Sequence, residues 1–144
     1  MGATTPFHPV ILLAEDDEND VLLLQIAFKR AGLRWPILRV ANGLEAKAYL
    51  NGDPPYHDRT RYPLPGLVLL DIKMPLMDGF EVLRWMRQQP EFGLIPVVIL
   101  TGSDRTGDAD AAQRLGANSF LVKPPDLNNS SEIAPLLERL MGPS

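Results

Sequence analysis

The stretch LVLLDIKMPLMDG, residues 67–79, gives the clearest structural signal in this sequence. Four apolar residues run directly into Asp71, and a continuous apolar run of this kind predicts a strand buried on both faces, as in a parallel sheet. Pro75 and the pair Asp78-Gly79 then break the chain into a tight loop. We therefore expect Asp71 at the carboxyl end of a central strand, the edge at which open α/β sheets bind ligands. The alternative, on this stretch alone, is that Asp71 only caps or satisfies the turn.

Four further apolar segments predict four more strands, at residues 10–14, 37–41, 96–100 and 119–122. Apolar residues recur at helical spacing between and after them, which predicts helices near residues 17–31, 43–51, 78–89, 108–115 and 131–140. Strands that alternate with helices form a parallel sheet with helices on both faces, because right-handed crossovers place them there. The expected fold class is therefore α/β with a doubly wound, five-stranded parallel sheet. Residues 1–9 are expected to be a loose lead-in to one domain at residues 10–141.

Length, net charge and residue content limit the classes of protein to which this chain can belong. A length of 144 residues suits one domain, and the net charge of −4 argues against a nucleic-acid-binding surface. The chain has no cysteine, so disulfides and thiol chemistry are not available to it. No apolar run approaches the length of a membrane span, and the N-terminus lacks a signal-peptide pattern. We expect a cytoplasmic protein that contacts neither membrane nor nucleic acid.

Polar residues of particular kinds stand where four of the five expected strands end: Glu15 and Asp16, Asp71, Thr101, and Lys123. Each alone has an ordinary explanation as a helix cap, a turn residue or a solvated charge. Parallel strands, however, bring these ends to one edge of the sheet, so together they predict an acidic pocket with a hydroxyl and an ammonium on its rim. Asp17 is expected to start the following helix instead, and Asp20 is expected to lie away from the pocket.

Such a pocket suits phosphoryl chemistry. Carboxylates held close together repel one another, and Mg²⁺ with its preference for oxygen ligands relieves that repulsion. One carboxylate can then attack phosphorus, while Lys123 and the hydroxyl of Thr101 hold the phosphoryl oxygens.

The four motifs, in this order, resemble those of a response-regulator receiver domain: Glu15-Asp16, Asp71 within DIKMPLMDG, Thr101-Gly102 and Lys123-Pro124. The resemblance extends from about residue 10 to residue 140. It implies the flavodoxin-like strand order 2-1-3-4-5. It also implies a two-component phosphorelay protein in which Asp71 accepts a phosphoryl group from a sensor histidine kinase. The output would then be a conformational switch that acts through protein contacts, or transfer of the phosphoryl group to a further phosphotransfer partner. A protein of this kind turns over no external substrate, so it is not expected to be an enzyme in the usual sense.

The resemblance also implies roles for individual residues in metal and phosphate binding. Asp16 and Asp71 would bind Mg²⁺ directly, together with the backbone carbonyl of Lys73. Glu15 would act through a metal-bound water, and Lys123 would pair with the phosphate. A lysine at position 73 departs from the neutral side chain of many relatives, which puts the lifetime of the phosphorylated form in question.

The switch of the family would involve Thr101 and Phe120, with the hydroxyl moving to the phosphate and the ring turning inward. Plain core packing is the alternative for Phe120. The Lys123–Pro124 peptide bond is expected to be cis. Pro135 falls inside the last expected helix, so that helix should either start late, near residues 131–134, or be kinked.

The connection at residues 51–66 is unusually long for a compact domain. Its YPLP sequence, residues 62–65, resembles a subset of stand-alone receivers that partner phytochrome-like or other bacterial sensor kinases. The loop would then contact the kinase or a second copy of the chain. The alternative is an ordered surface excursion whose tyrosines pack on the body.

Three classes of function remain to be compared at this point. The first is a single-domain receiver without an output domain. The second is an unphosphorylated pseudo-receiver that serves as a protein-docking module, which would have no need for Asp16, Asp71 and Lys123 together. The third is a flavodoxin-like cofactor carrier, for which Glu15, Asp16 and Asp17 would repel a phosphate in the absence of a metal. The complete acid set favours the first.

Overall fold

The computed structural model describes residues 9–102, 106–123 and 130–142. Its strands are β1 Ile11–Ala14, β2 Ile37–Val40, β3 Leu67–Asp71, β4 Val97–Thr101 and β5 Ser119–Val122. Its helices are α1 Glu18–Arg30, α2 Gly43–Asn51, α3 Gly79–Gln88, α4 Thr106–Arg114 and α5 Ser130–Met141. The expected lead-in at residues 1–9 lies almost wholly outside the described residues. Among the residues described, no helix has the length and apolar content needed to span a bilayer.

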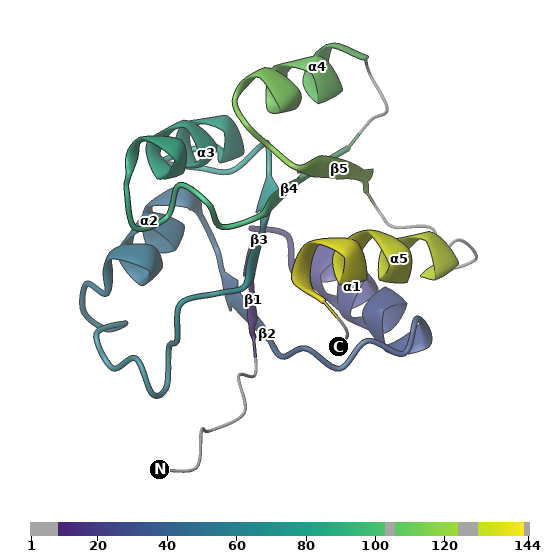
Figure 1. The fold of residues 1–144 in the computed structure, drawn as a ribbon, viewed down its shortest axis with the longest axis horizontal. Helices are drawn as coiled ribbons and strands as arrows, with labels where there is room; N and C mark the ends of the chain where they lie inside the picture. The colour runs from purple at the N-terminus through teal and green to yellow at the C-terminus, as the bar shows by residue number, and fades with distance from the viewer. Residues whose placement is uncertain (1–8, 103–105, 124–129, 143–144) are drawn as a thin grey trace.

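The five strands form one parallel sheet in the order β2-β1-β3-β4-β5. Figure 1 shows this sheet nearly edge-on, with α2 and α3 on one side, α1 and α5 on the other, and α4 beside β5. The predicted fold class and strand order are therefore confirmed. Covering helices on both faces explain why the central strands are continuously apolar.

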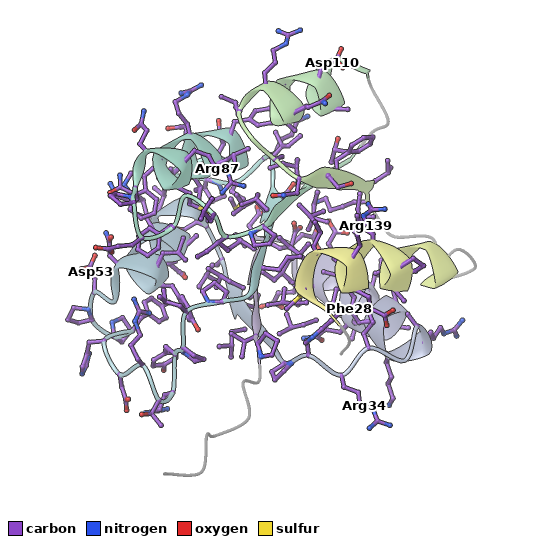
Figure 2. The ribbon with its side chains drawn as sticks, in the orientation of Figure 1. Phe28, Arg34, Asp53, Arg87, Asp110 and Arg139 are labelled. Carbon is purple, nitrogen blue, oxygen red and sulfur yellow. The ribbon has the colours of Figure 1, made fainter. Side chains whose placement is uncertain are left out.

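Two apolar clusters fill the space between the sheet and its helices, one on each side. Leu12 and Val68 belong to the cluster under α2 and α3, whereas Ile11 and Leu69 belong to the cluster under α1 and α5. Neighbouring residues of a strand thus serve opposite faces, as strand geometry requires. Figure 2 shows the side chains gathered against both faces of the sheet, with Phe28 of α1 among those of the second cluster.

The helix boundaries follow local chain chemistry. The Asp17 side chain caps α1 by accepting hydrogen bonds from the amides of Asn19 and Asp20, at 2.8 and 3.2 Å. Asp78 caps α3 in a capping box with Glu81. The last helix begins at Ser130, one residue before the expected late start near residues 131–134, and Pro135 lies beyond its first turn. The alternative, a kink at Pro135, stays a prediction. Pro135 has no amide hydrogen for the carbonyl four residues earlier, and α5 continues without that bond.

The long connection between α2 and β3, residues 52–66, is an ordered excursion that packs on the body. Tyr56 and Tyr62 stack against Tyr49 of α2, with ring centroids 5.3 and 6.0 Å away. Arg59 donates hydrogen bonds to the carbonyls of Tyr49 and Leu50 at the end of α2, at 2.9 and 2.7 Å. The Tyr49 carbonyl also accepts a hydrogen bond from the Gly52 amide, at 3.1 Å. The packing of the tyrosines on the body, the second interpretation of this loop, is therefore observed, and a contact with a kinase or a second copy of the chain stays a prediction.

Candidate functional site

The register of the sheet brings the predicted strand ends to one edge. Ala14 of β1 lies opposite Leu70 of β3, so the next residues, Glu15 and Asp71, come side by side. On the other side of β3, β4 pairs with β3 and β5 pairs with β4. Thr101, at the end of β4, lies opposite Val122 of β5, and Lys123 directly follows Val122 in the chain. The predicted convergence of these residues is observed.

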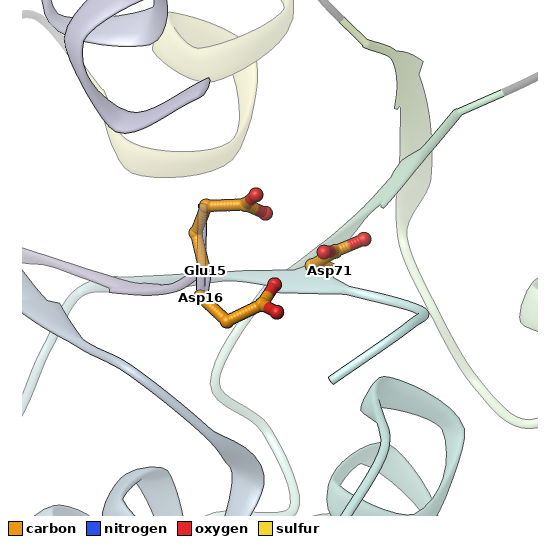
Figure 3. A group of neighbouring side chains, drawn as sticks. All are labelled: Glu15, Asp16 and Asp71. Carbon is orange, nitrogen blue, oxygen red and sulfur yellow. The ribbon is translucent and has the colours of Figure 1, made fainter. Parts of the chain in front are cut away.

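The acidic group consists of Glu15, Asp16 and Asp71, and each offers a carboxylate oxygen within 4.8 Å of the others. Figure 3 shows Glu15 and Asp16 extending their carboxylates toward Asp71 at the end of the sheet. Glu15 and Asp71 are buried, and Asp16 is exposed. Two oxygens bound to one Mg²⁺ at about 2.1 Å lie at most about 4.2 Å apart, so a group of this spread fits one ion bound directly or through a water.

Lys123 pairs with two acids of this group and with a further acid, Asp20. Its Nζ is 3.0 Å from Glu15 Oε1, 3.0 Å from Asp71 Oδ2 and 3.0 Å from Asp20 Oδ2. Burial lowers the pKa of Lys123, but its hydrogen bonds to Asp20, Asp71 and Glu15 outweigh that effect and the net shift is upward. The ammonium therefore stays charged and offsets part of the buried negative charge.

The pKa of Glu15 reflects how closely the negative charges lie together in this pocket. Burial, followed by the hydrogen bond with Asp71, raises the pKa of Glu15 to about 8, although Lys123 pulls in the opposite direction. The direction of this shift shows that the charged form of Glu15 is disfavoured in the pocket, and a further cation would favour it. The single positive charge of Lys123 thus balances only part of the negative charge of Glu15, Asp20 and Asp71.

These side chains line a cavity of about 440 Å³ at the carboxyl edge, whose rim also includes Lys73, Thr101 and Asp108. Thr101 is buried, and its hydroxyl donates to Asp108 Oδ2 of α4 at 3.4 Å. The Lys73 side chain is exposed, while its amide donates to Asp71 Oδ1 at 3.3 Å. The cavity has room for a small oxyanion between one hydroxyl and one ammonium.

In the loop after Asp71, the backbone at Gly79 lies close to the backbone of Asp71 and Ile72. The Gly79 amide donates to the carbonyl of Ile72 at 3.0 Å, and a Cβ at this position would collide with the carbonyl oxygen of Asp71. Only glycine fits there. The Asp78-Gly79 pair thus starts α3 directly against the end of β3.

One predicted site residue lies outside this pocket, and another is not among the described residues. Phe120 is 39% exposed and lines a second cavity of about 380 Å³ between α4 and β5. Its ring is therefore not packed in the core, and its role in a switch stays a prediction. Pro124 lies outside the described residues, and the cis Lys123–Pro124 bond stays a prediction as well.

Sequence reasoning missed three acids of the pocket. Asp17 caps α1 as expected, but it also lines the cavity. Asp20 was expected to point away, yet it binds Lys123, and Asp108 was not singled out at all. Helical phase was the missing signal, because Asp20 shares one face with the buried residues Leu24 and Ala27, and Asp108 shares one with Ala112. An acid on the inward face at the first turn of a helix points toward the carboxyl edge of the sheet.

The sequence model of the response regulator receiver domain matches residues 11–134. The chain belongs to this family. Its members are signalling proteins of two-component systems with a flavodoxin-like fold, and they bind Mg²⁺ at an acidic pocket.

Three relatives illustrate the similarity. Response regulator Rcp1 of Synechocystis is 37% identical over 120 residues, which are 83% of this chain and 80% of Rcp1. The crystal structure of Mn²⁺-bound Rcp1 has a TM-score of 0.75 at 35% identity, covering 90% of this chain and 91% of Rcp1. RPA3017, a response regulator in red light signaling of R. palustris, has a TM-score of 0.82 at 33% identity, with 91% and 92% covered. The phosphorylated cyanobacterial phytochrome response regulator RcpA has a TM-score of 0.78 at 31% identity, with 94% of each chain covered.

Proposed function

We propose that this receiver domain takes a phosphoryl group onto Asp71 from a phosphohistidine of a sensor histidine kinase, in a Mg²⁺-dependent reaction. The observation that carries the proposal is the position of Asp71. Its carboxylate is buried at the end of the central strand, in contact with Lys123 and within the acidic group of Glu15 and Asp16.

In the transfer, a carboxylate oxygen of Asp71 forms a bond to phosphorus while the bond from phosphorus to the histidine nitrogen breaks. The products are an aspartyl phosphate and a free imidazole. Lys123, now paired with Asp71, would move its ammonium to a phosphoryl oxygen, and the hydroxyl of Thr101 would donate to another in place of Asp108. Asp16 and Asp71 would hold the cation directly with the Lys73 carbonyl, and Glu15 would do so through water.

Lys123 balances only part of the negative charge of the carboxylates in the cavity, and a bound cation would balance more of it. When bound, Mg²⁺ offsets the carboxylates and the incoming phosphoryl charge. The raised pKa of Glu15 supports this requirement, because it marks a carboxyl group that lacks a sufficient counter-charge.

The kinase is proposed to be of the phytochrome type, and the receiver to act as a single domain through protein contacts. The support is the similarity to RcpA, a cyanobacterial phytochrome response regulator, and to RPA3017, a response regulator in red light signaling. Movement of Thr101 toward the phosphate would release its bond to α4, and Phe120 beside α4 would then be free to turn. The phosphoryl group shifts this equilibrium only by its differential affinity for the two states.

Acetyl phosphate with Mg²⁺ tests the proposal without a kinase. Intact mass should show the addition of one phosphoryl group to the wild-type protein, and both Asp71→Asn and removal of the metal by a chelator should abolish it. Asp17→Asn should keep the uptake, because asparagine also caps a helix. If the wild-type protein takes a phosphoryl group neither from acetyl phosphate nor from a histidine kinase, the docking-module interpretation replaces this one.

A further inference from the structure

Asp20 is an acid of the pocket that has no place in the mechanism above, and it contacts Lys123 directly. It is the third residue of α1, and its carboxylate reaches across to β5, where its Oδ2 lies 3.0 Å from Nζ of Lys123. The side chains of Asp20 and Lys123 are 25% and 13% exposed. The contact is therefore partly shielded from solvent and joins segments 103 residues apart in sequence.

The three carboxylate partners of Lys123 differ in what else they must do. Glu15 and Asp71 also belong to the acidic group that suits a divalent cation, whereas Asp20 does not. A bound cation would draw on the same oxygens as the ammonium and would repel it, since both are positive. Among the described residues that contact Lys123, Asp20 is thus the acid for which the cation does not compete.

A lysine that loses its partners has a strong tendency to leave the pocket. Its side chain is a flexible four-carbon stem, and its ammonium is strongly hydrated, so water competes well for it. Asp20 can hold the ammonium near the cavity after Glu15 and Asp71 have turned to the metal. Holding a group in place before the reaction removes the entropic cost of placing it during the reaction.

We propose that Asp20 is a positioning residue that keeps Lys123 at the rim of the pocket when the metal is bound, ready to bind the incoming phosphoryl oxygen. The inference rests on the proposed function, because it concerns the same site. It predicts a slower phosphoryl transfer without Asp20 even at saturating Mg²⁺, and not only a weaker affinity for the metal.

The test compares Asp20→Asn with Glu18→Gln. Both remove one negative charge from the first turn of α1, but Glu18 is exposed and lies outside the cavity. The Mg²⁺ affinity of each variant is measured by calorimetry, and the rate of phosphoryl uptake from acetyl phosphate is then measured at saturating Mg²⁺. The rate of Asp20→Asn should fall about fivefold, as expected for a partly exposed charge-assisted hydrogen bond, while Glu18→Gln should keep the wild-type rate.

A double-mutant cycle with Lys123→Ala separates positioning from a general effect of charge or folding. Without the lysine there is nothing for Asp20 to hold, so Asp20→Asn should cause no further loss in the Lys123→Ala protein. The same fold reduction in both backgrounds, or a wild-type rate for Asp20→Asn at saturating Mg²⁺, would overturn the inference. A wild-type protein that takes up no phosphoryl group would instead overturn the proposed function, so the two failures are distinguishable.

Discussion

Buried polar groups are paired differently in two regions of the molecule. One region is the acidic edge, formed by Glu15, Asp16 and Asp71, and the other is the loop at residues 52–66. In the loop, Arg59 donates to three backbone carbonyls, and the hydroxyl of Tyr49 donates to the carbonyl of Pro63 at 2.8 Å. At the acidic edge, one lysine is shared among several carboxylates, and the pKa of Glu15 is raised to about 8 because its charge is buried beside Asp71.

The difference separates a structural region from a binding site. Polar groups whose partners come from the chain itself gain nothing from an outside ligand, and removing one partner costs stability. Polar groups with too few partners cost stability as they stand, and a ligand of the right charge relieves that cost. The loop is thus expected to matter for folding, and the acidic edge for binding a cation and a phosphoryl group.

Asp16→Asn should have the largest effect on the binding side of this comparison. The substitution removes one of the charges around the proposed ion, and the affinity for Mg²⁺ should fall roughly 100-fold, about 2.7 kcal/mol, in a calorimetric titration. Asp17→Asn is the matched control, because it removes the same charge one residue later from a helix cap that asparagine can replace. An equal loss of affinity in both variants would contradict the assignment of Asp16.

Arg59→Ala should have the largest effect on the folding side. It removes the Arg59 donor from the partly buried carbonyls of Tyr49, Leu50 and Tyr62, of which Tyr49 keeps only its bond from the Gly52 amide. The free energy of unfolding in urea should therefore fall by about 2 kcal/mol. Phosphoryl uptake should not change. Arg61→Ala is the control, since Arg61 is exposed and only stacks over the ring of Tyr62 at 5.5 Å. Equal stabilities of the two variants would show that the loop is not held by Arg59.

The sequence allowed the strands and the acidic edge to be predicted because both follow from local rules. An apolar run that ends in Asp71 indicates a buried strand and the residue at its carboxyl end, and parallel pairing brings such ends together whatever the rest of the chain does. The placement of Asp20 was wrong because it was judged by distance along the chain from Asp16. Its helical phase with Leu24 would have placed it correctly.

The loop could not be assigned in the same way. Its tyrosines and arginines are the residue types that anchor protein interfaces, and the same types also pack on a protein's own surface. What decides between the two is the contact of Arg59 with the last carbonyls of α2, which depends on a chain path that no short pattern in residues 52–66 encodes. Non-local contacts of this kind need the structure.

Tyr49→Phe should have a smaller effect, and one that depends on pH. Losing the hydrogen bond to Pro63 should cost about 1 kcal/mol of unfolding free energy at neutral pH. Burial raises the pKa of Tyr49 from 10.0 to about 12 in the folded protein. The stability that this shift contributes is fully present below pH 10 and is lost as the pH rises through about 12.

Urea unfolding at neutral pH and again between pH 10 and 12 measures both effects, on the wild-type and Tyr49→Phe proteins. The wild-type protein should lose more stability between the two conditions than the variant, which has no hydroxyl to titrate at this position. Parallel losses in the two proteins would mean that the Tyr49 hydroxyl is not protected by the loop.

Lys73→Asn should have the smallest effect, because the Lys73 side chain is exposed at the rim of the cavity and its charge is screened by solvent. An ammonium two residues from Asp71 can pair with the phosphoryl group and hinder attack by water, so its loss should speed decay of the phosphorylated form roughly two- to threefold. The decay is followed by intact mass after the phosphodonor is removed, with the free energy of unfolding as a check that folding is unchanged. Lys29→Gln removes the same charge from the far end of α1 and should decay at the wild-type rate. If Lys73→Asn also decays at that rate, the ammonium points away from the phosphate, and the acidic edge alone sets the lifetime of the signal.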